Sequence, residues 1–431
     1  MNTEQLALLG GNPAISGELE PYLTMGEEEA QAAAAVVRSG VLSDFIGAPG
    51  EKFRGGAQVR AFEAMAADYF GVRHAVAVNS WTSGLIAAVG AIGIEPGDEV
   101  ITTPWTMSAT AMAILHFNGI PVFADIDPAS FNLNPESVES LVTSRTRAIL
   151  VVDIFGQSAD MPALRAIAER HGLQLISDTA QAPGAKQGSR YAGTLADIGG
   201  YSLNYHKHIH CGEGGLLVTD NDRLADRLRR IRNHGETVMD SNTPSELCNM
   251  LGYNFRMGEI EATIARIQLG KLEDKVRSRQ RAADQLNAQL GRLPGLNLPV
   301  VSEEATHVYY VYGMTLDVGQ LGVPRETITA ALRAEGIPGL MTGYQNLHRL
   351  PLFRNRIAYG TGGFPWTSEY CSRTISYGEG VCPVAERLHD HQFLGLLLCG
   401  CEFGADDVEQ VCAAFRKVWA QLGALAEAPR N

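Results

Sequence analysis

The stretch HAVAVNSWTSGLIAAVGAIGIEPGDEVITTPWTMSATAMAILHFNGIPVFADI, residues 74–126, alternates short apolar runs with longer helix-like runs. The runs at 74–78, 99–103 and 121–126 are short, apolar and rich in Val, Ile and Thr, which is typical of buried strands. The runs at 82–93 and 108–119 are long enough for helices, and each ends at a glycine. Strands separated by helices in this way predict a parallel sheet with helices on its faces.

The same alternation extends in both directions, from about residue 58 to 275. A helix is expected at 59–70, and further helix and strand runs follow at 135–142, 148–154, 161–172 and 173–178. A long helical stretch at about 258–290 leads into a region with one strand-like run, at 306–316, and helix-like runs at 324–336 and 404–422. We therefore predict an α/β fold in three parts: an arm (1–25), a large domain (26–275) and a smaller C-terminal α+β domain (276–431).

Composition narrows the class of protein. The 431 residues are 45% hydrophobic and 19% charged, as in ordinary globular enzymes, and the net charge is −13. An acidic chain without a basic cluster argues against nucleic acid as a partner. The N-terminus lacks the pattern of a signal peptide, no apolar run is long enough to span a bilayer, and the seven cysteines form no CxxC pair. We expect a cytoplasmic enzyme without a metal site or disulfides.

The segment YSLNYHKHIHCGEGGLLVTD, residues 201–220, holds a lysine in an unusual setting. Strand-like residues precede and follow it, so Lys207 is expected on a loop between two buried strands. His206, His208 and His210 surround it, and these histidines are equally well explained by packing within the loop. A lysine enclosed in this way loses hydration, which favours the neutral amine and its use as a nucleophile.

Two other segments suit ligand binding. The apolar run at 173–178 ends in Asp178, and ligands of open α/β folds bind at the carboxyl edge of the sheet. A carboxylate there suits a cationic ring nitrogen, although a turn-capping role fits as well. In residues 76–89, a strand passes through Thr82 and Ser83 directly into a helix. Hydroxyls and free amides at a helix N-terminus suit a phosphate, but such caps are common.

In chain order, these features resemble the fold-type I enzymes that use pyridoxal 5′-phosphate. More closely, the chain from about 20 to 425 is similar to the DegT/DnrJ/EryC1/StrS family of sugar aminotransferases. Six segments carry the resemblance: PGDEVITTPWTMSATAMAI (96–114), PVFADIDPASFNLNPESVE (121–139), DIFGQSADM (153–161), SDTAQAPGA (177–185), the run from Ser202 to Lys207 with GEGG behind it, and LGYNFRMGEIEA (251–262).

The resemblance implies a role for each matching residue. Lys207 is implied as the Schiff-base lysine and proton carrier, Asp178 as the partner of the pyridine nitrogen, and Gln181 as a contact on the phenolic oxygen side of the ring. The phosphate contacts implied are Thr82, Ser83 and Ser202. Asn254 is implied to reach the phosphate held by the other subunit of a homodimer, which makes the active sites shared.

Several positions depart from the family pattern. Met107 stands where an aromatic residue usually stacks on the ring, and a thioether also packs against a ring face. Trp81 replaces a small residue and is expected to narrow the pocket or cover the cofactor. Some family members are sugar dehydratases, with a histidine in place of the lysine. His208 agrees with one of their two histidines, but the spacing from Ser202 arrives at Lys207 and favours an aminotransferase.

The substrate is less well specified by the sequence. The loop GYQNLHRLPLF, residues 343–353, resembles a family loop at the mouth of the site. Its Tyr344 and His348, together with Trp81 and His208, are the substrate-contact candidates. The resemblance implies glutamate or glutamine as amino donor and a keto-sugar, usually nucleotide-linked, as acceptor. A keto-cyclitol acceptor, a sugar dehydratase and a non-catalytic regulatory protein are the alternatives.

Overall fold

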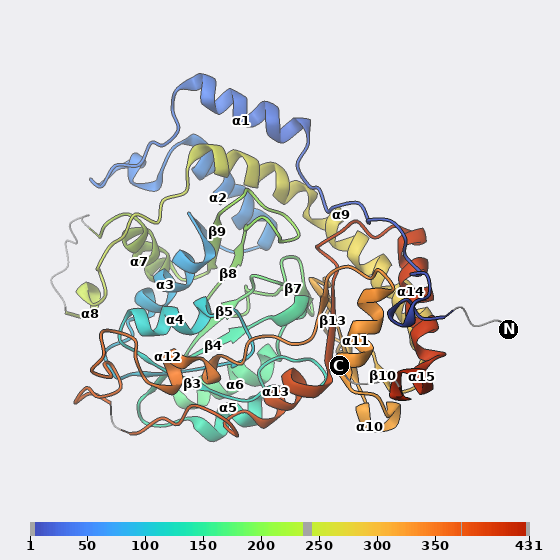
Figure 1. The fold of residues 1–431 in the computed structure, drawn as a ribbon. Helices are drawn as coiled ribbons and strands as arrows, with labels where there is room; N and C mark the ends of the chain where they lie inside the picture. The colour runs from blue at the N-terminus through green and yellow to red at the C-terminus, as the bar shows by residue number, and fades with distance from the viewer. Residues whose placement is uncertain (1–4, 236–243, 372, 428–431) are drawn as a thin grey trace.

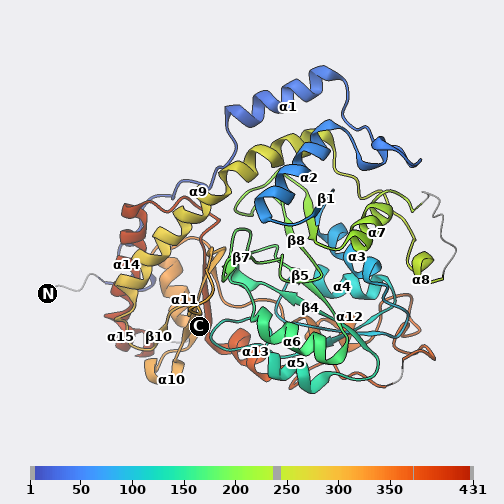
Figure 2. The ribbon, with the colours of Figure 1, turned by 180° about the vertical axis from the view of Figure 1, so that it is seen from behind.

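A seven-stranded sheet with helices on both faces forms the larger part of the chain (Figures 1 and 2). The computed structural model describes residues 5–235, 244–371 and 373–427. The strands of the sheet are β1 (His74–Val78), β2 (Glu99–Thr102), β3 (Ile120–Phe123), β4 (Thr146–Val152), β5 (Gln174–Asp178), β8 (Ile198–Ser202) and β9 (Gly215–Thr219). Their order is β1-β9-β8-β5-β4-β2-β3, and β9 runs antiparallel to both of its neighbours. The predicted mainly parallel α/β sheet is confirmed.

Alternation along the strands divides the apolar side chains between the two faces. On β4, Ala148 and Leu150 face one hydrophobic cluster, whereas Ile149 and Val151 face another. The helices on the first face are α3 (Trp81–Ile92), α4 (Ala109–His116) and α7 (Asp222–Arg232). The helices on the opposite face are α2 (Ala57–Phe70), α5 (Pro135–Leu141), α6 (Met161–His171) and the first part of α9 (Glu259–Leu290).

Helix α9 continues past the large sheet and packs against a second, smaller one (Figure 1). The smaller sheet is antiparallel, in the order β10 (Leu296–Asn297), β11 (Val311–Leu316), β13 (Phe393–Leu397), β12 (Leu340–Met341). Its helices are α10 (Val318–Leu321), α11 (Arg325–Ala334), α14 (Ala405–Trp419) and α15 (Leu422–Glu427). The predicted smaller α+β region therefore has a hydrophobic core of its own.

The chain returns to the large sheet between β12 and β13. This return holds α12 (Pro351–Arg354) and α13 (Pro383–Arg387), and its Leu347, Phe353 and Leu388 pack in the same cluster as strands β3 and β4. The expected division at residue 275 falls inside α9, and residues 347–371 and 373–388 lie on the large sheet. The parts of the fold are therefore not contiguous in sequence.

The remaining elements are short or peripheral. Helix α1 (Glu27–Ser39) projects from the top of the molecule in Figure 1, and Gly40 ends it in the left-handed region, at φ 75°. The others are α8 (Pro244–Leu247), the hairpin β6 (Lys186–Gln187) and β7 (Arg190–Tyr191), 3-10 turns at Ala7–Leu9, Glu51–Arg54, Ile154–Gly156 and Leu347–Arg349, and a π turn at Leu388–Gln392. Among the described residues, every helix is too short or too polar to cross a bilayer.

Candidate active site

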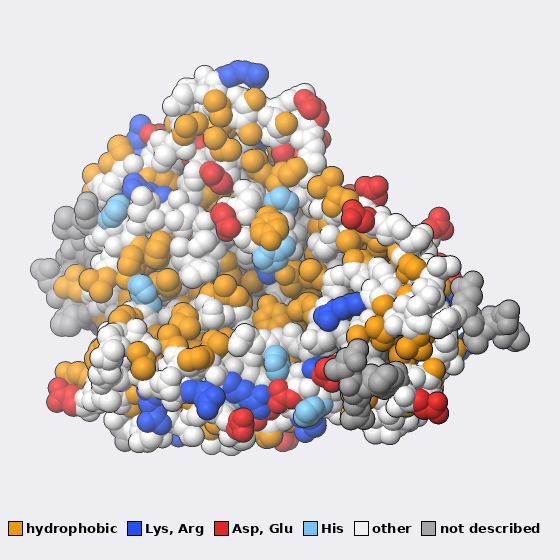
Figure 3. Space-filling model, in the orientation of Figure 1, with side chains coloured by type: hydrophobic (Ala, Val, Ile, Leu, Met, Phe, Trp, Pro, Cys, Tyr) orange, Lys and Arg blue, Asp and Glu red, His pale blue; other side chains and the backbone are white. Residues whose placement is uncertain are grey.

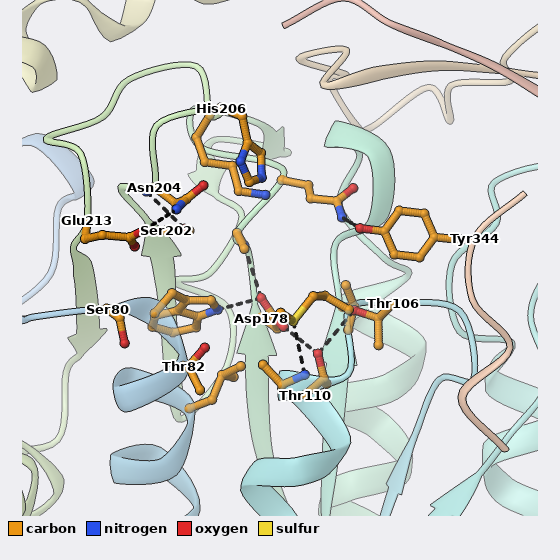
Figure 4. Close-up of a pocket in the computed structure, with 18 residues that line it drawn as sticks. Ser80, Thr82, Thr106, Thr110, Asp178, Ser202, Asn204, His206, Glu213 and Tyr344 are labelled. Atoms are coloured by element: carbon orange, nitrogen blue, oxygen red, sulfur yellow. Dashed lines mark hydrogen bonds between the residues drawn. The ribbon is translucent and has the colours of Figure 1, made fainter. Parts of the chain in front are cut away.

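A cavity of about 320 Å³ opens at the carboxyl ends of the large sheet's strands (Figure 4). Strands β4, β5 and β8 end at it with Val152, Asp178 and Ser202. Eight of the residues proposed from the sequence line it: Trp81, Thr82, Met107, Asp178, Gln181, Ser202, Lys207 and Tyr344. The site therefore lies at the carboxyl edge of the sheet, as predicted from the sequence and as expected for an open α/β fold.

Lys207 lies on the loop between β8 and β9 and is 7% exposed. Its backbone N–H donates to the Asn204 carbonyl at 3.0 Å, which closes a tight turn. Burial lowers the pKa of the Lys207 amine to about 8, and the negative charge of Asp178 opposes that shift. A sizeable fraction of the amine is therefore neutral near pH 8, which is the form that attacks carbonyl carbon.

Asp178 ends β5 and is buried, with donors on both of its oxygens. Thr110 Oγ1 donates to Oδ2 at 2.8 Å, while Trp81 Nε1 at 2.6 Å and Ala180 N at 3.2 Å donate to Oδ1. Burial raises the pKa of the Asp178 carboxyl, and the hydrogen bonds from Trp81 and Thr110 oppose that rise. The result is an oriented acidic group that suits a cationic partner.

Gln181 connects the end of β5 to Tyr344, which lies far along the chain. Its Nε2 donates to the Tyr344 hydroxyl at 3.1 Å (Figure 4). Its Oε1 accepts from the Phe155 backbone N–H at 2.9 Å. Tyr344 follows β12 in the segment that returns to the large sheet, so this returning segment supplies part of the cavity wall. The two contacts fix both ends of the Gln181 amide.

Hydroxyl groups gather where α3 begins. Ser80 caps the helix by accepting from Ser83 N at 3.1 Å, and Thr82 and Ser202 line the cavity beside it. Free N–H groups at a helix N-terminus and nearby hydroxyls together form an anion-binding arrangement. Ser83 is buried, and its hydroxyl is hydrogen-bonded with Ser80 Oγ. It therefore stabilises the turn and does not line the cavity.

Two of the substrate-contact candidates lie away from the cavity. His208 is fully buried, and its Nε2 bonds with the Val308 carbonyl at 2.8 Å. His348 is also fully buried, with Nε2 at 2.8 Å from Glu386 Oε1. The structure therefore corrects the expectation that these two histidines contact substrate, because each faces protein partners behind the wall.

Asn254 lies on the surface and does not line the cavity. Its carbonyl accepts from Asn79 Nδ2 at 3.2 Å, and its side chain accepts from Arg256 Nε at 2.8 Å. Met107 does line the cavity and is 58% exposed, with its Sδ accepting from Ala109 N at 3.2 Å. Its thioether therefore presents free surface to a ligand.

Sequence reasoning missed several cavity residues: Ser80, Thr106, Thr110, Asn204 and Glu213. His206, which the sequence places beside Lys207, also lines the cavity. Asn204 Nδ2 donates to Glu213 Oε1 at 2.8 Å, and burial lowers the pKa of His206 to about 4, which leaves it neutral. Thr110 lies in the first turn of α4, and its backbone N–H donates to the Met107 carbonyl at 3.2 Å, which brings these two cavity residues together. Among the described residues, His, Cys, Asp and Glu form no metal-binding group of three or more.

Comparison with known proteins identifies the relatives of this chain. Residues 26–392 match the DegT/DnrJ/EryC1/StrS aminotransferase family. The chain is 35% identical over 381 residues to an L-glutamine:2-deoxy-scyllo-inosose aminotransferase of Streptoalloteichus tenebrarius, covering 85% of this chain and 87% of that one. It is 37% identical over 277 residues to a GDP-perosamine synthase of Caulobacter vibrioides, covering 64% of this chain and 73% of that one.

A solved structure supports the same assignment. The aminotransferase from Psychrobacter cryohalolentis superposes with a TM-score of 0.79 and 25% identity, covering 94% of this chain and all of that one. Its similarity therefore extends over the large sheet, the cavity and the small domain. The chain belongs to the DegT/DnrJ/EryC1/StrS aminotransferase family and is an aminotransferase.

Proposed function

We propose that this aminotransferase works with pyridoxal 5′-phosphate bound covalently through Lys207. The observation that carries the proposal is the buried Lys207 amine, with a pKa of about 8, in the same cavity as the Asp178 carboxylate. When bound, the cofactor supplies an electron sink that stabilises negative charge at the substrate carbon. Lys207, once released by the amino donor, is placed to take a proton from the donor's Cα and to pass it on.

The residues present fit the cofactor. Asp178 has the charge and orientation to pair with a protonated ring nitrogen, and Gln181 lies on the neighbouring wall. The helix α3 N-terminus, with Thr82 and Ser202, suits the phosphate. Exposed Met107 has free surface to pack on a ring face. A cavity of about 320 Å³ lies within the range of roughly 300–1,000 Å³ of small-molecule sites.

The proposed donor is glutamate or glutamine, and the proposed acceptor is a keto-sugar, with nucleotide-linked keto-sugars as the first class to test. A keto-cyclitol is the second candidate, and the 35% identity to a 2-deoxy-scyllo-inosose aminotransferase favours it. Asn204, His206 and Glu213 form a polar wall of donors and acceptors, which suits hydroxyl groups on either acceptor. Both candidates are cyclic ketones with several hydroxyls.

We also propose a homodimer with shared active sites. Large apolar side chains are exposed around α1 and before α9: Leu23, Val37, Val41, Leu42, Ile46 and Leu251. Figure 3 shows apolar side chains on the projecting helix and on the face below it. A patch of this kind is typical of a protein interface. Asn254 lies three residues from Leu251, which supports a role for Asn254 across that interface.

Borohydride reduction tests the covalent link. Purified protein supplied with pyridoxal 5′-phosphate is expected to gain a visible absorbance, and reduction followed by peptide mass spectrometry is expected to find the cofactor on Lys207. A protein that takes up no cofactor contradicts the proposal. Transfer of the donor's nitrogen into the sugar product separates transamination from the alternative of sugar dehydration, whose product carries no new amino group.

A further inference from the structure

The indole of Trp81 is hydrogen-bonded to Asp178, although the two residues belong to different elements. Trp81 begins α3, and Asp178 ends β5. The indole Nε1–H donates to Asp178 Oδ1 across 2.6 Å, and both side chains are buried. Hydrogen bonds to an ionised acceptor are about twice as strong as neutral ones, so this contact constrains the carboxylate.

Two glycines make room for the indole. A Cβ added to Gly84, on α3, would lie 2.7 Å from Cε3 of Trp81. A Cβ added to Gly200, on β8, would lie 2.3 Å from Cζ3. Gly200 is the register partner of Asp178 on the neighbouring strand, so the space above Gly200 lies directly beside the carboxylate. The slot formed by these two glycines therefore holds the indole at the position where its N–H meets Asp178.

Trp81 and Thr110 act differently on the carboxylate. Thr110 donates to Oδ2, but its hydroxyl can equally accept a hydrogen bond from a protonated carboxyl (Figure 4). An indole N–H is a donor only, and its hydrogen bond to a carboxylate oxygen is stronger than one to the carbonyl oxygen of a neutral carboxyl. The contact from Trp81 therefore favours the ionised form of Asp178, in surroundings where burial favours the neutral form.

We propose that Trp81 is a positioning residue: its indole N–H keeps Asp178 ionised. The proton between the Asp178 carboxylate and the cofactor's ring nitrogen then stays on the nitrogen. The inference rests on the proposed function, in which Asp178 pairs with that nitrogen. It differs from the expectation that Trp81 contacts substrate, because it assigns the indole N–H to the carboxylate. A ring nitrogen that loses its proton is a weaker electron sink, so the proton-transfer step at Lys207 slows.

The test uses Trp81→Phe in the cofactor-loaded enzyme, because phenylalanine keeps an aromatic ring in the slot and removes the N–H. With ¹⁵N-labelled pyridoxal 5′-phosphate, the ring-nitrogen NMR signal is expected to move from the protonated toward the unprotonated position. The kcat of the donor half-reaction is expected to fall about tenfold, as for loss of a hydrogen bond to a charged group.

Trp419→Phe is the matched control, since it loses an indole hydrogen bond to the Pro294 carbonyl, far from the cavity. Its ring-nitrogen signal is expected to match wild type.

An unchanged ring-nitrogen signal in Trp81→Phe overturns the inference while leaving the proposed function intact. Wild-type protein that takes up no cofactor overturns both. Gly84→Ala provides a second variant if Trp81→Phe does not fold, because the added methyl group displaces the indole without removing it. Alanine favours the helix at this position, so the protein is expected to remain folded. Its signal is expected to move in the same direction, and no movement counts against the inference.

Discussion

The Nζ atom of Lys207 lies over the ring of Tyr310, 4.4 Å from its centroid. Lys207 comes from the large domain, whereas Tyr310 directly precedes β11 of the small sheet. Tyr310 is itself buried, so it covers the amine and helps to exclude water from it. The small domain therefore contributes to the low pKa of Lys207, because removal from water is the main cause of that shift.

Cofactor uptake is expected to depend on pH with an inflection near 8. The pKa of Lys207 is lowered to about 8, so the reactive neutral amine increases as pH rises through that value and levels off above it. The check is the rate of covalent uptake of pyridoxal 5′-phosphate, followed by absorbance between pH 6 and about 10. A rate that keeps rising to the ordinary lysine pKa would contradict a buried amine.

Tyr310→Ala is expected to move that inflection to higher pH. Removing the ring admits water to Lys207, and hydration raises the pKa of the amine toward its ordinary value. Tyr310→Phe keeps the ring and is expected to retain the wild-type profile. The same uptake assay measures both variants, and equal profiles for Tyr310→Ala and Tyr310→Phe would show that the ring does not set the pKa.

Lys207→Ala is expected to lower aminotransferase activity by about a thousandfold, because nucleophile and proton carrier are lost together. Lys52→Ala is the control, since Lys52 is an exposed lysine paired with Asp44. Activity is measured as 2-oxo acid released from the donor, and circular dichroism checks the fold. Near-normal activity of Lys207→Ala would remove this lysine from the mechanism.

Mixing two inactive variants tests whether the sites are shared. Lys207→Ala and Asn254→Ala are each expected to be impaired, but a mixed dimer regains one intact site if Asn254 acts on the cofactor held by the other subunit. Random exchange makes half of the dimers mixed, so about a quarter of wild-type activity is expected. Activity that stays at the level of the separate variants would place both residues in the same subunit's site.

The buried ion pair between Arg232 and Glu63, at 2.5 Å, is expected to dominate the stability of the β1 region. Arg232→Met leaves Glu63 buried without its partner and is expected to cost about 3–5 kcal/mol of unfolding free energy. Adding Glu63→Gln removes the unpaired charge and retains an acceptor for the Ala77 N–H, so part of the loss is expected to return. Urea unfolding measures both variants.

Arg277→Ala is the matched surface control for that ion pair. Arg277 pairs with Glu273 one helical turn away, and both side chains are largely exposed. The expected loss of unfolding free energy is small, because water screens the pair. Equal losses for Arg232→Met and Arg277→Ala would contradict the importance of burial.

Contiguous sequence was sufficient to predict the layers of the large domain and the principal cavity residues. Apolar runs of strand length between helical runs predicted the parallel sheet, because periodicity is a property of neighbouring residues. Asp178 was predicted as a site residue because it ends an apolar run of strand length. Lys207 was predicted because it lies on a loop between two such runs. Gln181 and Ser202 followed from the family resemblance and lie in the same cavity.

Contacts between distant parts of the chain were decided only by the tertiary structure. Residues 347–371 and 373–388 return to the large sheet, Tyr310 covers Lys207, and His208 and His348 contact partners inside the protein. Trp81 meets Asp178 because Gly200, 119 positions further along the chain than Trp81, leaves space beside the carboxylate. The sequence by itself determined the elements of the large sheet and the chemical groups at their ends, whereas three of the four strands of the small sheet were not predicted. The packing of elements far apart in the chain decided which groups face the ligand and which face the protein. Local periodicity cannot predict that packing, because it reflects only neighbouring residues.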